Sequence, residues 1–353
     1  MKRKILIGFT LLLSIGTLAS CTNGTSTSQQ PTTSTPSTEL PPDTSNTSVI
    51  LPSSSYPEDV FSITSFGDAY TGATIPLACR IDGGLLAPED QLGTVYTITE
   101  GSELATIENQ RYVTFKDTAG SITIEGTLEK EDKTYTAELQ LDIKDFTEGA
   151  LTVAEVKEQE VGSTILASGV VTAFVGSFSG GRNGLYLSDE TQTIYVYGYE
   201  TAEQVERGDE VVISGTISEY NGCLQITSPS LERKRDGDGT YPDPSAYISN
   251  SEPIKISELK AMNDIAGQTF KLTGKIETYH GQGNEGSYTN YNFTQGSSEN
   301  DRISIYSSAG SYDCPENEWL DEYIGTDVTV AFYINSKNSS GKWRGNIIYI
   351  FEG

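Results

Sequence analysis

The sequence predicts an all-β chain, in which a sandwich of two sheets is followed by two five-stranded Greek-key barrels. From residue 60 onward, short stretches alternate apolar and polar side chains with a period of two, and glycines and charged turns separate them. Segments 148–235 and 254–353 also repeat one another, with strands, a short helical piece and a closing hairpin in the same order. Alternation predicts strands, and the repeat predicts that the last two domains share one fold.

The chain begins with the features of a secretion signal, at residues 1–20. The basic residues Lys2, Arg3 and Lys4 precede an apolar run that ends in Leu18-Ala19-Ser20-Cys21. The run is shorter than the roughly 20 residues that a membrane-spanning helix needs, so we expect it to be removed. It resembles the lipoprotein signals of bacteria, which implies that Cys21 is acylated, for example with palmitate, and anchors the chain outside the cytoplasm. An ordinary secretory peptide with an accidental cysteine is the alternative.

Residues 21–59 are predicted to form a flexible tether. They consist mainly of Thr, Ser, Pro and Asn, and they contain no Lys or Arg. Such a composition buries too little apolar surface to offset the entropy lost on ordering. As a flexible coil, a segment of this length spans on the order of 35 Å, which would hold a folded domain clear of the lipid headgroups.

Residues 60–147 are predicted to form the sandwich. Alternating stretches at Tyr112–Phe115, Ser121–Ile124 and Thr134–Ile143 are interpreted as strands that each turn one face toward a core. Together with Leu104–Ile107 and Gly120–Gly126, they resemble the bacterial immunoglobulin-like domains of surface proteins. The resemblance implies a spacer role for this domain.

Each repeated segment is predicted to form a barrel. In segment 148–235 the helical piece Thr201–Glu206 falls between the third and fourth strands, which is the element order of an OB-fold. The predicted strands are Ile165–Val175, Gly184–Ser188, Thr193–Tyr199, Glu210–Glu219 and Cys223–Ser228. In segment 254–353, Gly274 aligns with Gly169, and a mid-strand glycine suits a long first strand that bends sharply. Both segments resemble the OB-like domains attached to secreted bacterial nucleases, with an acidic linker, 236–253, between them.

Tyrosines dominate one predicted face of the first barrel. Alternation directs four aliphatic residues inward, Leu185, Leu187, Ile194 and Val196, and leaves four tyrosines outward: Tyr186, Tyr195, Tyr197 and Tyr199. This part of an OB-fold is its usual ligand surface, where flat rings stack on bases or sugars. The adjoining loops would add Phe178, Arg182 and Tyr220. Two alternatives remain: the rings pack on a neighbouring domain, or they reflect the strand propensity of tyrosine alone.

The second barrel offers basic and aromatic residues in alternation. Its segment carries only five more acids than bases, a smaller excess than in the two preceding domains. The residues expected to face outward are Lys271, Lys275 and Tyr279 in the first strand, Arg302, Ser304 and Tyr306 in the third, and Lys342, Trp343 and Arg344 in the last hairpin. This interleaving suits a groove that follows a nucleic-acid strand, and it is also common on solvated sheet faces.

Metal binding and catalysis have little support in the sequence. Asp236, Asp238 and Asp243 lie among glycines as in a calcium loop, but Tyr247 stands where an EF-hand would have its last glutamate, so a plain acidic turn is the alternative. His280 is the only histidine, which largely excludes His-based metal clusters and triads. Nucleophile-elbow, phosphate-loop and dinucleotide motifs do not occur. We therefore expect no metal, no cofactor and no enzymatic activity.

Charge and resemblance together favour an extracellular binding module. The formal charge of −26 becomes −29 once the three basic residues of the leader are removed, and such a surface repels polyanions. Two ligands suit stacking tyrosines: single-stranded nucleic acid, which the family resemblance favours, and a surface glycan, which the charge favours. One alternative is a stalk or adhesin with a protein partner, which predicts a covered tyrosine face. Another is an accessory subunit of a secreted nuclease or glycosidase.

The remaining cysteines do not indicate a disulfide framework. Cys79, Cys223 and Cys314 lie in three separate segments of the chain. We interpret them as small apolar side chains in partly buried positions.

Overall fold

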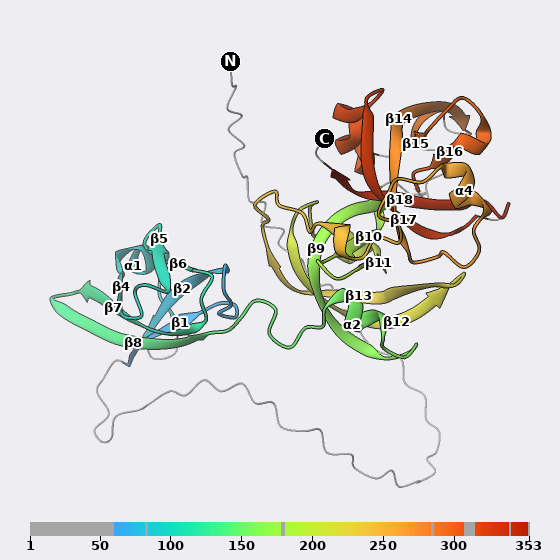
Figure 1. Cartoon of the computed structure of the whole chain (residues 1–353). Helices are drawn as coiled ribbons and strands as arrows, with labels where there is room; N and C mark the ends of the chain where they lie inside the picture. Colours follow the sequence, from blue (N-terminus) through green and yellow to red (C-terminus); the bar gives the residue numbers. More distant parts are fainter. Residues whose placement is uncertain are drawn as a thin grey trace, which may run out of the picture. The chain divides into compact units, whose positions relative to one another are not determined.

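The computed structural model describes residues 60–81, 84–177, 181–283, 286–306, 315–338 and 340–351, which form three successive β-domains (Figure 1). The predicted all-β fold is confirmed. The helices of the described residues are short, and none is long and apolar enough to cross a membrane. The predicted leader and tether, with Cys21, lie outside the described residues, as do Phe178 and Cys314.

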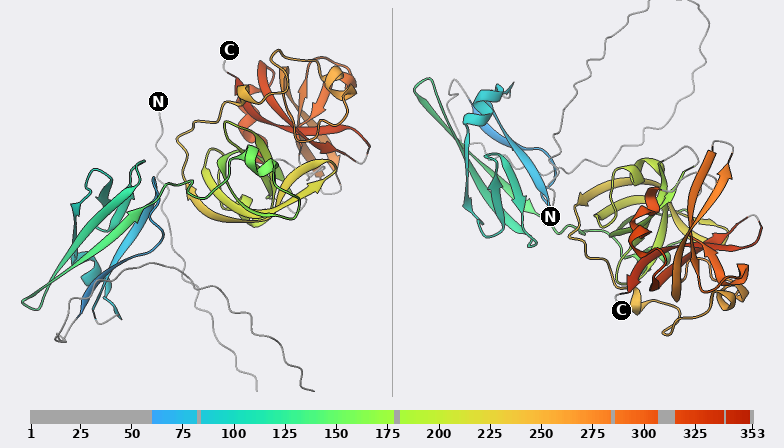
Figure 2. Two further views of the ribbon diagram at one scale, coloured as in Figure 1. Left: turned by 60° about the horizontal axis from the view of Figure 1, so that its bottom comes forward. Right: turned by 90° about the horizontal axis from the view of Figure 1, so that it is seen from above.

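The first domain is a sandwich of two antiparallel sheets (Figures 1 and 2). One sheet has the order β1-β2-β6-β5 with β3 on β2, and the other has the order β4-β7-β8. Alternate residues of β7, among them Ile122 and Ile124, meet Leu77, Val113 and Phe115 in the core, as strand periodicity requires. The strands are β1 Phe61–Ser65, β2 Thr74–Ile81, β3 Gly84–Leu85, β4 Val95–Glu100, β5 Ala105–Glu108, β6 Tyr112–Phe115, β7 Gly120–Lys130 and β8 Lys133–Ile143, with helix α1 at Pro88–Gly93.

The second domain, barrel 1, is a closed five-stranded barrel with the order β10-β11-β13-β12-β9. Parallel pairing of β11 with β13 closes it, and helix α3 lies between the third and fourth strands, as the sequence predicted. Helix α2 precedes the barrel, and Thr152 and Glu155 form a capping box at its start. The elements are α2 Val153–Lys157, β9 Thr164–Gly176, β10 Arg182–Ser188, β11 Thr193–Tyr197, α3 Tyr199–Glu203, β12 Glu210–Tyr220 and β13 Cys223–Arg235.

The third domain, barrel 2, repeats the element order but is joined more weakly along one side. Its sheet runs β16-β15-β14-β17-β18, and among the described residues one parallel bridge, between Ile305 and Gly345, connects its two edges. In the short helix η3, Leu320 lies within the core and Trp319 packs against it. The elements are α4 Ile256–Ala261, β14 Thr269–Gly283, β15 Gly286–Thr294, η2 Glu299–Asp301, β16 Arg302–Ser304, η3 Pro315–Tyr323, β17 Asp327–Lys337 and β18 Trp343–Phe351.

The two mid-strand glycines sit where neighbouring backbone approaches the first strand. A Cβ on Gly169 would lie 2.8 Å from the carbonyl oxygen of Ser188, and one on Gly274 would lie 2.3 Å from that of Thr294. Both distances are too short for a side chain, so the absence of a Cβ permits the long strands β9 and β14 to pass so close to their neighbours.

Residues 236–253, predicted as a linker, pack against barrel 1. A short 3-10 helix, η1 Pro244–Ala246, interrupts them. The hydroxyl of Tyr247 lies 3.0 Å from that of Thr193 in β11, and Ile248 packs against a cluster of buried residues from both barrels. The linker therefore contributes to the packing of the barrels.

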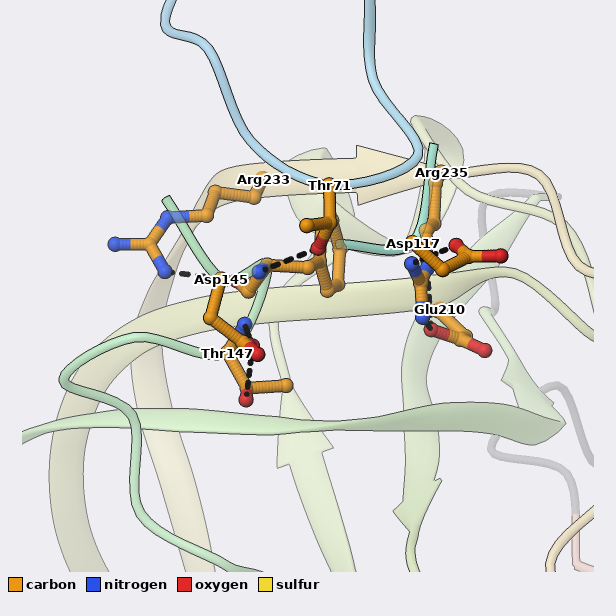
Figure 3. Close-up of polar contacts among 8 residues, drawn as sticks. Thr71, Asp117, Asp145, Thr147, Glu210, Arg233 and Arg235 are labelled. Carbon is orange, nitrogen blue, oxygen red and sulfur yellow. Dashed lines mark hydrogen bonds and ion pairs between the residues drawn. The ribbon is translucent and has the colours of Figure 1, made fainter. Parts of the chain in front are cut away.

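Two arginines at the end of β13 contact residues that precede barrel 1 (Figure 3). Arg233 donates from Nη1 to the carbonyl oxygen of Phe146, at 2.8 Å. Arg235 pairs with Glu210, and its Nη1 lies 3.4 Å from a carboxylate oxygen of Asp117. Both arginines belong to the part of β13 beyond Ser228, where the sequence predicted that the strand would end. The additional part of β13, residues 229–235, thus supplies contacts with the sandwich and with the segment that connects the sandwich to barrel 1.

Candidate functional site

The sequence assigned the residues of β10 and β11 to the correct sides of the strands. Four aliphatic side chains lie in the interior of barrel 1, namely Leu185, Leu187, Ile194 and Val196. Tyr186 and Tyr195 point to the opposite side, as predicted. The prediction that they are uncovered is wrong, because their exposed fractions are 0% and 5%.

Barrel 2 covers these two tyrosines. Ala331, Tyr333 and Ile348, on β17 and β18, join Tyr186 and Tyr195 in one buried cluster. The rings of Tyr186 and Tyr333 meet edge to face with centroids 5.4 Å apart, a favoured geometry for aromatic pairs. Periodicity tells which side of a strand a residue occupies, but it does not tell whether another domain lies there.

Hydrogen bonds extend the contact between the barrels. The side-chain amide of Asn335 donates to the Tyr186 hydroxyl at 3.3 Å, and that of Asn346 donates to the Phe174 carbonyl oxygen at 3.0 Å. The thiol of Cys223 lies 3.5 Å from the Tyr333 hydroxyl. Because the groups are buried and bonded across the contact, the two barrels share one core instead of touching at a solvated surface.

Lys157 is a half-buried cation at this interface. Its ammonium group donates to the Gln192 side-chain oxygen and to the Gly267 carbonyl oxygen, both at 3.0 Å, and it lies 5.6 Å from the centre of the Tyr333 ring. Burial lowers the pKa of Lys157 from 10.5 to about 8. The protein therefore holds this proton less tightly than the unfolded chain does.

The depressed pKa of Lys157 predicts that stability rises with pH above about 8. Between pH 8 and 10.5 the unfolded chain binds more protons at this site, so the free energy of unfolding increases across that window. From pH 8 to 9.5 the gain is about 2 kcal/mol. The raised pKa values of Tyr186 and Tyr333 act in the opposite sense, but only as the unfolded phenols titrate near pH 10.

Urea unfolding of the chain and of Lys157→Met at pH 7 to 9.5 measures this effect. The difference between the two free energies should change by about 2 kcal/mol over the interval, in favour of the lysine at higher pH. Parallel curves for the two proteins would show that Lys157 does not govern the pH dependence.

Trp343 does not belong to the outer face of barrel 2, so that prediction is wrong. Its ring lies in the core, with an exposed fraction of 7%, and its indole nitrogen donates to the Met262 carbonyl oxygen at 3.1 Å. Consecutive residues of a strand point to opposite faces, so Trp343 and Arg344 cannot both point outward from β18. Arg344 is the one that does.

Arg182 serves the structure of barrel 1 itself. Its guanidinium carbon lies 3.8 Å from the Phe174 ring, its Nη2 pairs with Glu206 at 2.7 Å, and its Nη1 donates to the Ala202 carbonyl oxygen at 3.2 Å. These contacts connect β10 with the segment around α3. They leave little of the guanidinium for a ligand, in contrast to the prediction.

The predicted groove of barrel 2 carries acids beside its bases. A hollow of about 590 Å³ is lined by Lys255, Lys275, Glu277, Asp301 and Asp327, together with polar and glycine residues, and none of its lining residues is aromatic. Lys275 lies 3.8 Å from Asp327, and Arg302 lies 3.7 Å from Glu277. Pairing of this kind neutralises the positive charge that a nucleic-acid strand would need.

Four predicted tyrosines remain well exposed. The exposed fractions are 47% for Tyr197, 53% for Tyr199, 53% for Tyr220 and 50% for Tyr279. Tyr199 lies at the start of α3, and Tyr279 lies on β14 of barrel 2. Tyr197 and Tyr220 differ from these two because they border the contact between the barrels.

The border of the contact gathers the exposed rings around an arginine. Tyr197 lies beside Tyr195, with ring centroids 6.4 Å apart. From barrel 2, the guanidinium carbon of Arg344 lies 3.9 Å from the ring of half-buried Tyr306. Tyr306 packs against the buried cluster that contains Tyr195 and Cys223, and Tyr220 is the strand partner of Cys223. We call these five residues the tyrosine seam: Tyr195, Tyr197, Tyr220, Tyr306 and Arg344.

The carboxylates of the predicted calcium loop interact with residues close to them in the sequence. Asp238 and Asp243 accept from the backbone N–H groups of Thr240 and Ser245 at 2.8 and 2.9 Å, and Asp236 lies 3.6 Å from Lys234. Within the described ranges, no group of three or more His, Cys, Asp or Glu residues could hold a metal ion. His280 lies 3.2 Å from the Thr289 hydroxyl on the neighbouring strand.

No family model and no curated protein matches the chain. Among solved structures, it is similar to one described as "Structural mimicry for functional antagonism", with 16% identity over 54% of this chain and 93% of that one, at a TM-score of 0.27. Another is described as "Molecular basis for abrogation of activation of pro-inflammatory cytokines", with 15% identity over 54% and 94% and a TM-score of 0.26. Similarities this low carry no argument about fold or function.

Proposed function

We propose that the chain is a non-catalytic binding protein, held at the outer face of a bacterial membrane by lipid on Cys21, and that it binds a surface glycan at the tyrosine seam. The observation that supports this proposal most is the exposure of Tyr197 and Tyr220 next to the buried cluster of both barrels against which Tyr306 packs. Rings with one free face suit stacking on sugars, and their hydroxyls suit hydrogen bonds to sugar oxygens.

A glycan fits the charge of the chain better than nucleic acid does. Affinity for nucleic acid depends largely on neutralising several phosphates, whereas this chain has a formal charge of −26 and pairs Lys275 and Arg302 with acids. Stacking on a sugar needs no such excess of basic residues. Binding to a glycan should therefore depend only weakly on salt concentration.

Retention on glycan and oligonucleotide arrays at two salt concentrations tests the proposal. The protein is the chain from residue 21 with Cys21→Ser, which remains unacylated. We expect Tyr197→Ala combined with Tyr220→Ala to weaken glycan retention at least tenfold, because two stacking faces are lost. Phe66→Ala, which removes a ring of similar exposure, 46%, from the sandwich, should bind unchanged. Equal binding by the double variant would remove the seam as the site.

A stalk or adhesin that presents its surface to a protein partner is the second candidate. The covered faces of Tyr186 and Tyr195 favour it, since the stalk hypothesis predicts that a neighbouring domain occupies them. Buried residues of both barrels also share one cluster, as the packing of domains in a spacer requires. In the array experiment, this candidate predicts no retention on any glycan or oligonucleotide.

A further inference from the structure

Barrel 2 contains two arginines, Arg302 and Arg344, and only Arg344 lies at the border of the contact between the barrels without a carboxylate beside it. Its Nε donates to the Ser336 hydroxyl at 3.2 Å, and its guanidinium lies over the Tyr306 ring. Arg302, Lys275 and Lys342 each lie within 4.0 Å of a carboxylate, whereas Arg344 has no carboxylate at that distance in the described part of the chain.

The groups around Arg344 are phenols with unused hydrogen-bonding capacity. Tyr195 has an exposed fraction of 5%, and its buried hydroxyl has no hydrogen-bond partner within the described ranges. The ring of Tyr306, over which the Arg344 guanidinium lies, packs against the buried cluster that contains Tyr195. An arginine without a carboxylate partner and a buried hydroxyl without a hydrogen-bond partner thus lie in the same border region as the exposed rings of Tyr197 and Tyr220.

We propose that Arg344 binds the carboxylate of an acidic sugar, such as a uronate or a sialate, while Tyr197 and Tyr220 stack on the sugar rings. This inference rests on the proposed function, because it names the class of glycan that the tyrosine seam takes. The free N–H groups of a guanidinium match the two oxygens of a carboxylate in a bidentate arrangement. The N–H groups of Arg344 that do not bond Ser336 would then bond the carboxylate of the ligand.

A single cation favours an acidic sugar over a nucleic-acid strand. A strand presents one phosphate per nucleotide and needs a row of basic residues to follow it. The tyrosine seam contains four tyrosines and one arginine, which suits an isolated negative charge within an otherwise neutral chain of sugars.

The inference is tested by comparing each acidic sugar with its carboxyl-reduced form, first on the chain that keeps Arg344. We would measure the Cys21→Ser chain on an array of uronate- and sialate-bearing oligosaccharides, each printed beside its carboxyl-reduced form, with oligodeoxythymidine on the same slide. We expect at least one acidic sugar to bind about tenfold or more tightly than its reduced form. Arg344→Gln should remove that preference and leave the reduced form bound as before, and Arg344→Lys should restore only part of it.

Lys342→Gln is the matched control, since it removes the same charge two residues away, from a lysine that pairs with Glu299. It should keep the preference for the acidic sugar. Equal binding of acidic and reduced sugars by the chain that keeps Arg344 would overturn the role of Arg344 but leave the proposed function standing. Failure of every sugar would overturn both. Tighter binding of oligodeoxythymidine, lost in Arg344→Gln, would show that the anion is a phosphate and would also overturn the inference.

Discussion

Replacing Tyr333 by Ala should lower the free energy of unfolding of the two barrels by about 3–5 kcal/mol, the usual cost of removing a large buried aromatic ring. Tyr333 is fully buried, and its ring lies against Tyr186 on the opposite barrel. Its removal leaves a cavity that neither barrel can fill alone. Urea unfolding followed by circular dichroism should show the single transition of the two barrels shift to lower urea and separate into two.

Two variants make this result interpretable. Tyr333→Phe keeps the ring and loses only the hydroxyl beside Cys223, so it should cost about 1 kcal/mol. Tyr199→Ala removes a ring that is 53% exposed and should change the free energy by less than about 0.5 kcal/mol. If Tyr333→Ala and Tyr199→Ala unfolded at the same urea concentration, the barrels would not share a core.

Gly345→Ala should destabilise barrel 2 by about 1–3 kcal/mol or more, through steric overlap. A Cβ at this position would lie 1.9 Å from the Tyr333 carbonyl oxygen and 2.6 Å from the Phe332 ring. The same glycine accepts a hydrogen bond from the Tyr306 backbone N–H and makes the only β-bridge described between the edges of the sheet. The added methyl group would therefore force apart β17, β18 and the strand end at Tyr306.

Gly93→Ala is the matched control for this substitution. Gly93 ends helix α1 and is exposed, and a Cβ there would approach only Leu128, at 3.6 Å, which is an ordinary contact. Alanine suits a helix better than glycine does, so the thermal midpoint should stay the same or rise slightly. A thermal midpoint for Gly345→Ala as high as that of Gly93→Ala would contradict the close packing at the barrel edge.

Strand periodicity carried most of the fold prediction, and β6 shows why. Its bounds, Tyr112–Phe115, match the predicted stretch, because inward Val113 and Phe115 alternate with more polar neighbours. The elements of barrel 1 follow the predicted order for the same reason. Boundaries set by contacts between domains were less predictable, as in β13, which continues past Ser228 to Arg235.

The sequence did contain an indication that the two barrels pack together, but it lay on β17 of barrel 2 and not on the strands that carry Tyr186 and Tyr195. In β17, Val330, Phe332 and Ile334 fill the interior of barrel 2, and the residues between them, Ala331 and Tyr333, are also apolar or aromatic. A stretch without polar positions, as at Val330–Ile334, is typical of burial on both faces. This pattern indicates that something covers β17, although it does not name the tyrosines of barrel 1 as the partner.

By itself, the sequence determined the all-β class, the order of elements and the inward side of the strands, because these depend on local alternation and on turns between neighbouring residues. Only the tertiary structure decided that Tyr186 and Tyr195 are buried against barrel 2, and that Arg344 stands beside Tyr306. Those contacts join residues more than a hundred positions apart or on different strands, and their geometry follows from how whole sheets pack. A pattern along one strand carries no record of that packing.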